Sequence, residues 1–340
     1  MNSPVFSYSD SFLELLSGAR ASIMFSSHQA NRVGLIYEHR GKLSVDVIRF
    51  ARPTGFAFIQ DRVVIATENE LIFGRHIPAV IPRLSDQKDR HDSCYVIQKR
   101  FATGNLDIHE MAWTDDELWF INTRFSCLCI WDGEHSFVPK WKPRFVTEYA
   151  AEDRCHLNGL ALENDQPTFV TAFGHGNSKE SWRESPKDTG VIVNLNSGDI
   201  IASGLNMPHS PRWHEGQLWF IQSGAGWLCR VNVDSGAVEH VTQLPGFGRG
   251  MTFFGRYALI GLSKGRPSSR IGELTEHEEW FCGIVVVDLN SGKLVGALRF
   301  EDAIEELFNI ELLGHTQHPA LISLESHPEV VSTLFTTPTV

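Results

Sequence analysis

Two histidines, His109 and His209, stand one hundred residues apart in the same sequence context. Asn158 lies between them, shortly after His156, and Asp107 precedes His109 by two residues. Neutral imidazoles bind transition metals, and a carboxylate can orient a histidine through its other ring nitrogen. Histidine also exchanges protons close to neutral pH. These residues therefore predict one of three arrangements: a metal site of His109, Asn158 and His209, a metal-free binding or acid–base site, or a polar channel that holds only water.

An internal repeat positions these residues. The stretch from His109 to Ile130 returns as His209 to Arg230, with eight of 22 positions identical. A third copy, HLNGLAL, begins at His156, so the repeating unit is about 50 residues long. Self-similarity at this period is typical of propellers and solenoids.

A large apolar residue marks the first strand of each unit. Six positions carry it: Phe58, Trp113, Leu162, Trp213, Phe253 and Leu313. Alternating strands follow, with turn sequences such as NSG and DSG that supply the positive φ of a tight hairpin. The pattern predicts an all-β fold, a six-bladed β-propeller of four-stranded antiparallel blades.

We expect residues 1–340 to form a single propeller domain. Strand-like runs at both ends predict a closing blade shared between residues 21–50 and 307–326, which would remove exposed sheet edges. Long loops are predicted at residues 80–106, 174–189 and 263–280. The last two fall between the second and third strands of their blades, where loops often form lids or binding surfaces.

A polar residue stands four positions before each of these apolar markers. The six polar residues are Thr54, His109, Asn158, His209, Arg249 and Asn309. The innermost strands of a propeller run beside its axis and alternate residues face that axis, so this column is expected to line the central channel. A ring of buried polar side chains requires ordered water or a ligand.

Further candidates are expected around the channel mouth. Proton transfer is assigned to His109, His156 and His209, with Asp107 orienting His156. Substrate binding is assigned to Thr54, Arg124, Arg249, Asn309, His175 and Lys264. Other candidates for the same face are Arg154, Lys179, Trp182, Arg183 and Arg266. A pocket both cationic and aromatic suits an anionic small molecule or a peptide-like metabolite.

Composition limits the class of partner. Acidic residues outnumber basic ones by 41 to 30, and no run of Lys or Arg is present, so we expect no nucleic-acid partner. No stretch approaches the length of a membrane span, and we expect no membrane partner. Cys129 and Cys229 hold the same repeat position, which favours core packing in a reducing cytoplasm over a metal pair.

Six motifs, DIHEMAW, NTRFSC, RCHLNGLAL, MPHSPRW, PGFGRGM and CGIVVVDL, resemble those of a family of bacterial conserved hypothetical proteins with a domain of unknown function. The resemblance covers nearly the whole chain and implies a propeller fold. NGLAL is also remotely similar to a strand of the six-bladed gluconolactonase and strictosidine-synthase propellers, in which an Asn before Gly helps hold a divalent cation. Asn158 is the matching residue. Because the ring carries two histidines and no acid, a transition metal (Zn, Fe, Mn or Cu), or none, fits better than calcium.

Two classes of function follow. The first is an enzyme of lyase, cyclase or hydrolase type that uses the His/Asn cluster on a small molecule at the channel mouth, with or without a transition metal. The second is a non-catalytic propeller that binds a ligand or a protein on its loop-rich face. Gly-x-Ser-x-Gly and the P-loop context are both missing, so a nucleophile-elbow hydrolase and P-loop nucleotide binding are disfavoured.

Overall fold

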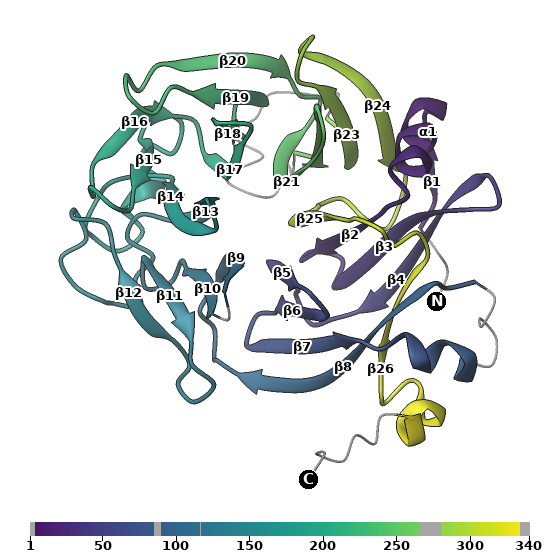
Figure 1. Cartoon of the computed structure of the whole chain (residues 1–340). Helices are drawn as coiled ribbons and strands as arrows, with labels where there is room; N and C mark the ends of the chain where they lie inside the picture. Colours follow the sequence, from purple (N-terminus) through teal and green to yellow (C-terminus); the bar gives the residue numbers. More distant parts are fainter. Residues whose placement is uncertain (1–3, 85–89, 116, 266–279, 334–340) are drawn as a thin grey trace.

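The computed structural model of the chain describes residues 4–84, 90–115, 117–265 and 280–333. Six sheets stand in a ring around a central axis (Figure 1). Each sheet contains four antiparallel strands, and two of the sheets gain a fifth strand from near a chain end. The predicted six-bladed β-propeller is therefore confirmed. Within the described residues, no helix is long and apolar enough to cross a membrane.

Five blades are built from four consecutive strands, with the first strand innermost. Blade 1 contains β5 (Phe56–Ile59), β6 (Arg62–Ala66), β7 (Glu70–His76) and β8 (Ser93–Ala102). Blade 2 contains β9 (Ile108–Thr114), β10 (Glu117–Asn122), β11 (Cys127–Trp131) and β12 (Val138–Trp141). Blade 3 contains β13 (Leu157–Glu163), β14 (Gln166–Ala172), β15 (Gly190–Asn194) and β16 (Ile200–Leu205). Blade 4 contains β17 (Pro208–His214), β18 (Gln217–Gln222), β19 (Trp227–Val231) and β20 (Val238–Gln243). Blade 5 contains β21 (Phe247–Phe254), β22 (Tyr257–Ser263), β23 (Gly283–Asp288) and β24 (Lys293–Phe300).

Blade 6 closes the ring with strands from both ends of the chain. It contains β25 (Asn309–Leu313) as its innermost strand, then β2 (Ser22–Ser27), β3 (Arg32–His39) and β4 (Lys42–Arg49). β25 pairs antiparallel with β2, and Asn309 lies opposite Ser26. The predicted sharing of one blade between the N- and C-terminal strands is confirmed, and every apolar marker residue lies on an innermost strand.

The N-terminal segment, which precedes β2 of blade 6 in the chain, connects blade 6 to blade 5. β1 (Phe6–Tyr8) pairs with β24 as the outermost strand of blade 5. α1 (Asp10–Ala19) follows, and its N-cap residue Ser9 accepts a hydrogen bond from the Phe12 N–H. Phe12 and Leu16 are buried in a core cluster shared with blades 5 and 6, so this helix covers the junction of the two blades.

The C-terminal segment corrects two sequence-based boundaries. β26 (Pro319–Ser323) pairs parallel with β8 of blade 1, so the assignment of residues 307–326 to the closing blade is wrong for this strand. The predicted loop at 80–106 is wrong for the ten residues of β8, and the 3-10 helix η1 (Pro78–Arg83) precedes them. Another 3-10 helix, η4 (Pro328–Thr333), follows β26 and contacts η1.

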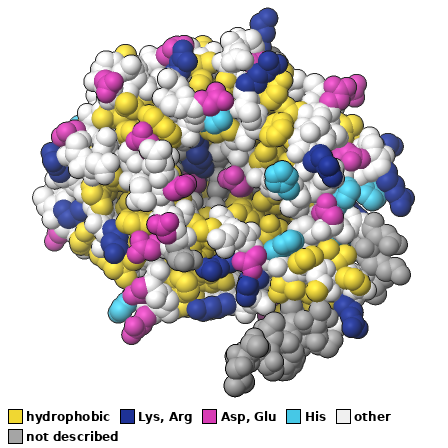
Figure 2. Space-filling model, in the orientation of Figure 1, with side chains coloured by type: hydrophobic (Ala, Val, Ile, Leu, Met, Phe, Trp, Pro, Cys, Tyr) yellow, Lys and Arg dark blue, Asp and Glu magenta, His cyan; other side chains and the backbone are white. Residues whose placement is uncertain are grey.

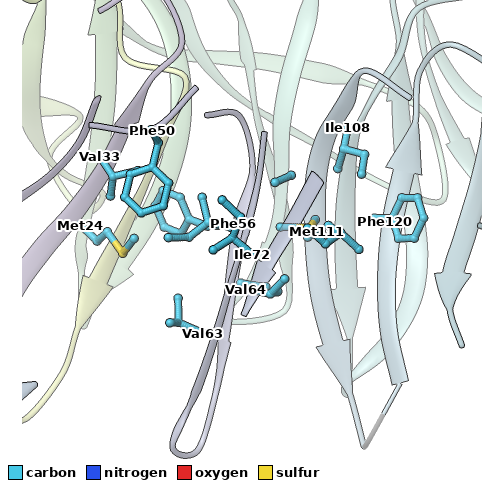
Figure 3. Close-up of a cluster of buried hydrophobic side chains, with 14 of the residues drawn as sticks. Met24, Val33, Phe50, Phe56, Val63, Val64, Ile72, Ile108, Met111 and Phe120 are labelled. Atoms are coloured by element: carbon cyan, nitrogen blue, oxygen red, sulfur yellow. The ribbon is translucent and has the colours of Figure 1, made fainter. Parts of the chain in front are cut away.

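Apolar side chains fill the spaces between neighbouring blades. One cluster joins Met24 of blade 6, Phe56 of blade 1 and Phe120 of blade 2 (Figure 3). Cys129 belongs to the same cluster, and Cys229 is fully buried in another. The predicted core position of both cysteines is therefore confirmed, and each is a free thiol.

A buried hydroxyl lies within one residue of the end of the second strand in all six blades. The six residues are Ser26, Thr67, Thr123, Thr171, Ser223 and Ser263. Four of them donate across a blade junction to a carbonyl oxygen near the start of the next innermost strand. The donor–acceptor pairs are Ser26–Thr54, Thr123–Leu157, Ser223–Gly248 and Ser263–Leu307. These hydrogen bonds satisfy buried backbone groups that no β-ladder reaches.

Replacing Ser26 by Ala is expected to lower the free energy of unfolding by about 1–3 kcal/mol, because the Thr54 carbonyl loses its 2.6 Å donor at the closing junction. Denaturant unfolding at neutral pH measures the change. The matched control is Ser7→Ala, which removes an exposed hydrogen bond to Glu301 and is expected to cost about 0.5 kcal/mol or less. Equal losses in the two variants would contradict a role for the buried hydroxyl in closing the ring.

Candidate functional site

The central channel has a mouth, where the innermost strands begin, and a far end, where they finish. The predicted polar column lies at the mouth. Five of its members are buried: Thr54, His109, Asn158, His209 and Asn309. The sixth, Arg249, is half-buried. His109, His209 and Arg249 also influence one another's charge states, so blades 2, 4 and 5 bring them close together.

His109 and His209 are held by the same hydrogen-bond relay. His109 Nδ1 lies 2.9 Å from the Thr123 hydroxyl, which donates its single hydrogen to the Leu157 carbonyl. His109 Nδ1 must therefore carry the proton, and its Nε2 keeps a lone pair. Ser223 fixes His209 in the same way, at 2.8 Å. Neither Nε2 has a hydrogen-bond partner among the residues that the structure describes.

Burial keeps both imidazoles neutral at physiological pH. It lowers the pKa of His109 to about 4, although Asp107 acts in the opposite direction. Burial also lowers the pKa of His209 well below its usual value, and the positive charge of Arg249 adds to this effect. The mouth therefore offers two neutral Nε2 acceptors.

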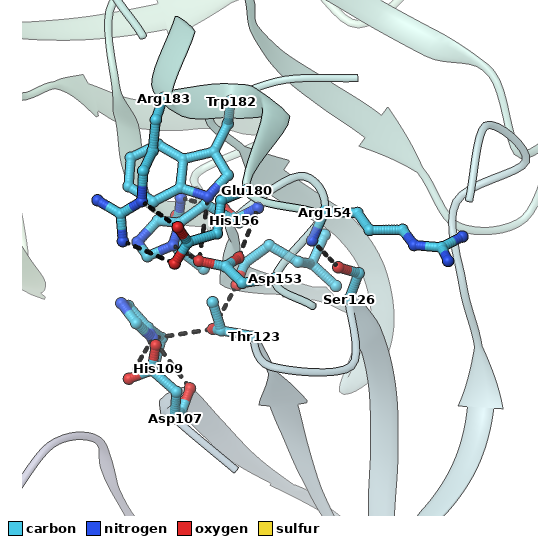
Figure 4. A network of polar contacts seen from close by, with 12 residues as sticks. Asp107, His109, Thr123, Ser126, Asp153, Arg154, His156, Glu180, Trp182 and Arg183 are labelled. Carbon is cyan, nitrogen blue, oxygen red and sulfur yellow. Dashed lines mark hydrogen bonds and ion pairs between the residues drawn. The ribbon is translucent and has the colours of Figure 1, made fainter. Parts of the chain in front are cut away.

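The carboxylate that orients His156 is Asp153, so the predicted role of Asp107 is wrong. His156 Nδ1 lies 2.9 Å from Asp153 Oδ2, and Trp182 Nε1 donates to the same oxygen at 3.0 Å (Figure 4). The His156 ring lies against Trp182 and Phe173, with ring centroids 4.3 and 4.5 Å away. Asp107 instead lies 3.7 Å from His109 Nδ1. Hydrogen bonding and ring packing thus fix the orientation of the His156 ring.

A cavity of about 300 Å³ adjoins this pair. Its charged lining residues are Asp107, Arg124, Glu152, Asp153, Lys179, Glu180 and Arg183. Three of these are basic and four are acidic, so the predicted cationic pocket is in fact of mixed charge. The Nε of Arg124 is buried, and it has no hydrogen-bond partner in the described part of the chain.

Arg249 is engaged inside the mouth. Its guanidinium lies 3.8 Å from the centre of the Phe308 ring and 3.5 Å from a carboxylate oxygen of Glu306. The Phe308 ring in turn lies 5.2 Å from that of His109. Arg249 is therefore placed beside the histidines, with its charge balanced by Glu306.

Four predicted binding residues, Thr54, Asn309, His175 and Lys264, do not line the mouth cavity. The Thr54 carbonyl accepts the Ser26 hydroxyl, and the Asn309 side chain accepts its neighbour's backbone N–H. His175 lies near the Thr189 carbonyl, and Lys264 donates its backbone N–H to Glu305. Arg266 falls outside the described residues.

Arg154 serves the structure rather than a ligand. Its guanidinium is bound by the Glu148 and Glu152 carboxylates, by the Thr147 hydroxyl and by the Asn177 side chain. These contacts tie the segment before β13 to the insertion between β14 and β15. The sequence-based placement of Arg154 among the anion-binding candidates is therefore not supported.

Asn158, one of the three predicted metal ligands, is engaged in other hydrogen bonds. Asn158 Oδ1 accepts the Thr171 hydroxyl at 2.8 Å, and Asn158 Nδ2 donates to the His156 carbonyl. Across the described ranges, no group of three His, Cys, Asp or Glu side chains is placed to hold a metal ion. The two imidazoles are better described as hydrogen-bond acceptors.

A second cavity, which sequence analysis missed, lies at the far end. Its volume is about 350 Å³, and its charged residues are Glu110, Arg212 and Glu311. Arg212 binds both oxygens of Glu110 at 3.1 Å and so links blade 4 to blade 2. Figure 2 shows a hollow at the centre of the ring with acidic and basic side chains around it.

β-Bulges explain why Glu110 and Arg212 escaped prediction. The strand register shifts in blades 2 to 5 at the polar column or just after it, for example between His209 and Arg212. A bulge interrupts the alternation of side chains, so His109 and Glu110 can both serve the channel although they are consecutive. A pattern of strict alternation could not find Glu110 or Arg212.

Comparisons with known proteins support the fold and leave the site open. A family profile described as "Domain of unknown function (DUF4915)" matches residues 10–322. A search of curated proteins found no match. A chain in the crystal structure of a nidogen/laminin complex is similar with a TM-score of 0.56 and 11% identity, over 87% of this chain and 99% of that chain. A protein of unknown function from Bacteroides caccae is similar with a TM-score of 0.53 and 10% identity, over 86% of this chain and 98% of that chain.

Replacing His109 by Asn, the residue in the same column of blades 3 and 6, is expected to reduce acid sensitivity. The pKa of His109 is lowered to about 4 in the folded state, so the neutral form of His109 favours folding. This contribution to the free energy of unfolding is fully present above pH 6.5 and is lost as pH falls toward 4. Between pH 7 and pH 5 the wild type should lose about 2 kcal/mol more than the variant. Urea unfolding at both pH values measures this difference.

The matched control is His315→Asn, because His315 is exposed and Asn tolerates its positive φ of 61°. This variant is expected to keep the wild-type pH dependence. If His109→Asn also kept it, the buried neutral state of His109 would be refuted.

Proposed function

The chain belongs to the DUF4915 family, a domain of unknown function, and from the geometry of its channel mouth we propose that it binds a small molecule and transfers a proton through His156. The molecule would carry both a positive and a negative charge, as an amino acid or short peptide does. The observation that carries this proposal is the hydrogen bond between His156 and Asp153, a residue that lines the mouth cavity.

The Asp153–His156 pair suits proton transfer. Asp153 holds the Nδ1 proton of His156, so a neutral His156 keeps the lone pair on Nε2. Among the described residues, no group hydrogen-bonds to this Nε2. The nearby carboxylate would stabilise the imidazolium that forms when His156 accepts a proton. Asp153 is thus a positioning residue, and His156 would be the group that meets the substrate.

The charges around the mouth cavity favour a ligand with both signs. Arg124, Lys179 and Arg183 could bind a carboxylate, since Arg forms paired hydrogen bonds with this group. Asp107 in the same lining could bind an ammonium group, whereas Glu180 is paired with Arg183 at 3.2 Å. A purely anionic ligand would meet four acidic side chains, so a peptide-like ligand is the better match of the two expected classes.

The deeper histidines would bind the polar atoms of the same ligand. His109 and His209 are neutral and keep Nε2 as an acceptor, so N–H or O–H groups of the ligand suit them. The His109 ring centre lies 4.9 Å from that of His156, which places the acceptor and the proposed base side by side. Proton transfer next to a carbonyl or carboxylate is a step of many lyase and cyclase reactions, which agrees with the reaction types expected from sequence.

A binding panel tests the ligand class first. Amino acids and dipeptides, each with its N-acetyl and its amide derivative, are added to the full chain, and binding is measured by the shift in Tm and by calorimetry. At least one zwitterion is expected to bind more tightly than both of its singly charged derivatives. Tighter binding of all the singly charged forms would refute the proposed ligand class.

Asp153→Asn and His156→Gln test the proton transfer. The compound that binds is incubated in D2O, and loss of its C–H signal next to the carboxylate is followed by NMR. Wild type is expected to exchange this proton, His156→Gln to bind without exchange, and Asp153→Asn to be slower by about tenfold or more.

The surface of the same protein supplies a matched control. Asp132 and His135 form an exposed pair with the same spacing and a 2.7 Å contact, so Asp132→Asn removes an equivalent carboxylate away from the mouth. This variant is expected to exchange at the wild-type rate. Unchanged exchange in His156→Gln would eliminate His156 as the base.

A further inference from the structure

The far-end cavity combines charge with a wide apolar wall. Phe56, Phe58, Trp113 and Trp213 are among its lining residues, together with aliphatic side chains from four blades. Its volume of about 350 Å³ falls within the usual range for small-ligand sites. The charged residues Glu110, Arg212 and Glu311 stand at the same cavity. Such a mixture is typical of a site that binds an apolar body and orients one polar group.

Arg212 has little capacity left for an anionic ligand. Two of its nitrogens bind Glu110, and its Nε donates to the Met251 carbonyl at 3.0 Å. Its Nη1 also reaches the carbonyls of Leu160 and Pro211. Burial acts to lower the pKa of Arg212, but the Glu110 carboxylate outweighs burial and the pKa is raised. Arg212 and Glu110 thus neutralise each other and leave Glu311 as the additional charged group.

Glu311 keeps one oxygen available. Its Oε1 accepts the Thr252 hydroxyl at 3.1 Å. No hydrogen bond reaches Oε2 from the part of the chain that the structure describes, and Glu311 lines the cavity with part of its surface accessible. A carboxylate in apolar surroundings is strongly favoured by a cationic partner.

An indole N–H is also unsatisfied at this end of the channel. Trp113 lines the cavity, and its Nε1 is buried without a hydrogen-bond partner within the described ranges. Buried N–H groups are normally paired, so an unpaired indole N–H in a residue that lines a cavity is unusual. The faces of Trp113 and Trp213 can in addition attract a cation.

We propose that the far-end cavity binds a small aromatic or aliphatic amine, whose ammonium group pairs with Glu311 and whose apolar body packs against Trp113 and Trp213. This site is separate from the channel mouth, because the Glu110–Arg212 ion pair follows the histidine layer along the innermost strands. The proposal does not depend on proton transfer at His156, and either can fail without the other.

The ionisation of Glu311 gives this site a pH dependence. Burial raises the pKa of Glu311 to about 7, against the effects of Arg212 and the Thr252 hydroxyl. The charged groups that face Glu311 are Arg212 on β17 and Glu110 on β9, while β2 places Met24 opposite it in the sheet. Below pH 7 a proton competes with the amine for Glu311, so binding should weaken about tenfold between pH 8 and pH 6.

Calorimetry with 2-phenylethylamine tests the proposal on the full chain. The amine is expected to bind at pH 8, about tenfold more weakly at pH 6, and more tightly than neutral 2-phenylethanol or anionic 3-phenylpropanoate. Glu311→Gln is expected to lower the affinity at pH 8 by about tenfold or more, because a charge-assisted hydrogen bond is lost. Glu215→Gln, which changes a highly exposed acid in the β17–β18 turn, is the matched control and should bind as the wild type does.

The indole N–H resonance of Trp113 gives a second measurement on unmodified protein. It is expected to shift as the amine is added, and this result does not depend on the folding of a variant. Equal affinity for the amine and the alcohol would overturn the proposal, as would full affinity in Glu311→Gln. An unmoved Trp113 resonance at saturating amine would place the binding elsewhere and also overturn it.

Discussion

The closure of six innermost strands around one axis is the constraint on which the rest of this molecule depends. Strands that converge this closely bring backbone carbonyls together at the blade junctions, where no β-ladder can reach them. A hydroxyl at the end of the second strand meets this need at four junctions, in residues Ser26, Thr123, Ser223 and Ser263. In two blades the same hydroxyl also fixes a channel histidine. Ring closure and the chemistry of the mouth therefore share the same hydrogen bonds.

The fold followed from the sequence because its signals are local and repeated. Apolar markers, hairpin turns and a period near 50 residues each specify one blade, and six copies specify the ring. Repetition also placed His109 and His209 at equivalent positions. It did not identify their partners, since Thr123 and Ser223 match in chemistry but not in identity. A comparison of the repeats by hydroxyl content, rather than by identical residues, would have found the relay.

The site itself was less predictable because the backbone departs from a regular strand. Asp107 and His156 precede the innermost strands with positive φ angles of 54° and 50°. The chain turns sharply at such residues, so their side chains do not follow the alternation of the strand. The sequence suggested Asp107 as the partner of His156 because each stands two residues before a member of the polar column, His109 or Asn158. The actual partner, Asp153, lies in the same local turn and has a positive φ of its own.

The bulges have a larger consequence, because they place polar side chains at two levels of one channel. Above the bulge lie neutral histidines beside a cavity lined by charges of both signs. Below it, Glu110 and Arg212 satisfy each other, and Glu311 is set in an apolar wall. The surroundings therefore differ between the two ends, since connecting segments line the mouth cavity and innermost strands line the far-end cavity. Burial favours the neutral form of both groups, although His109 is a base at the mouth and Glu311 is an acid at the far end.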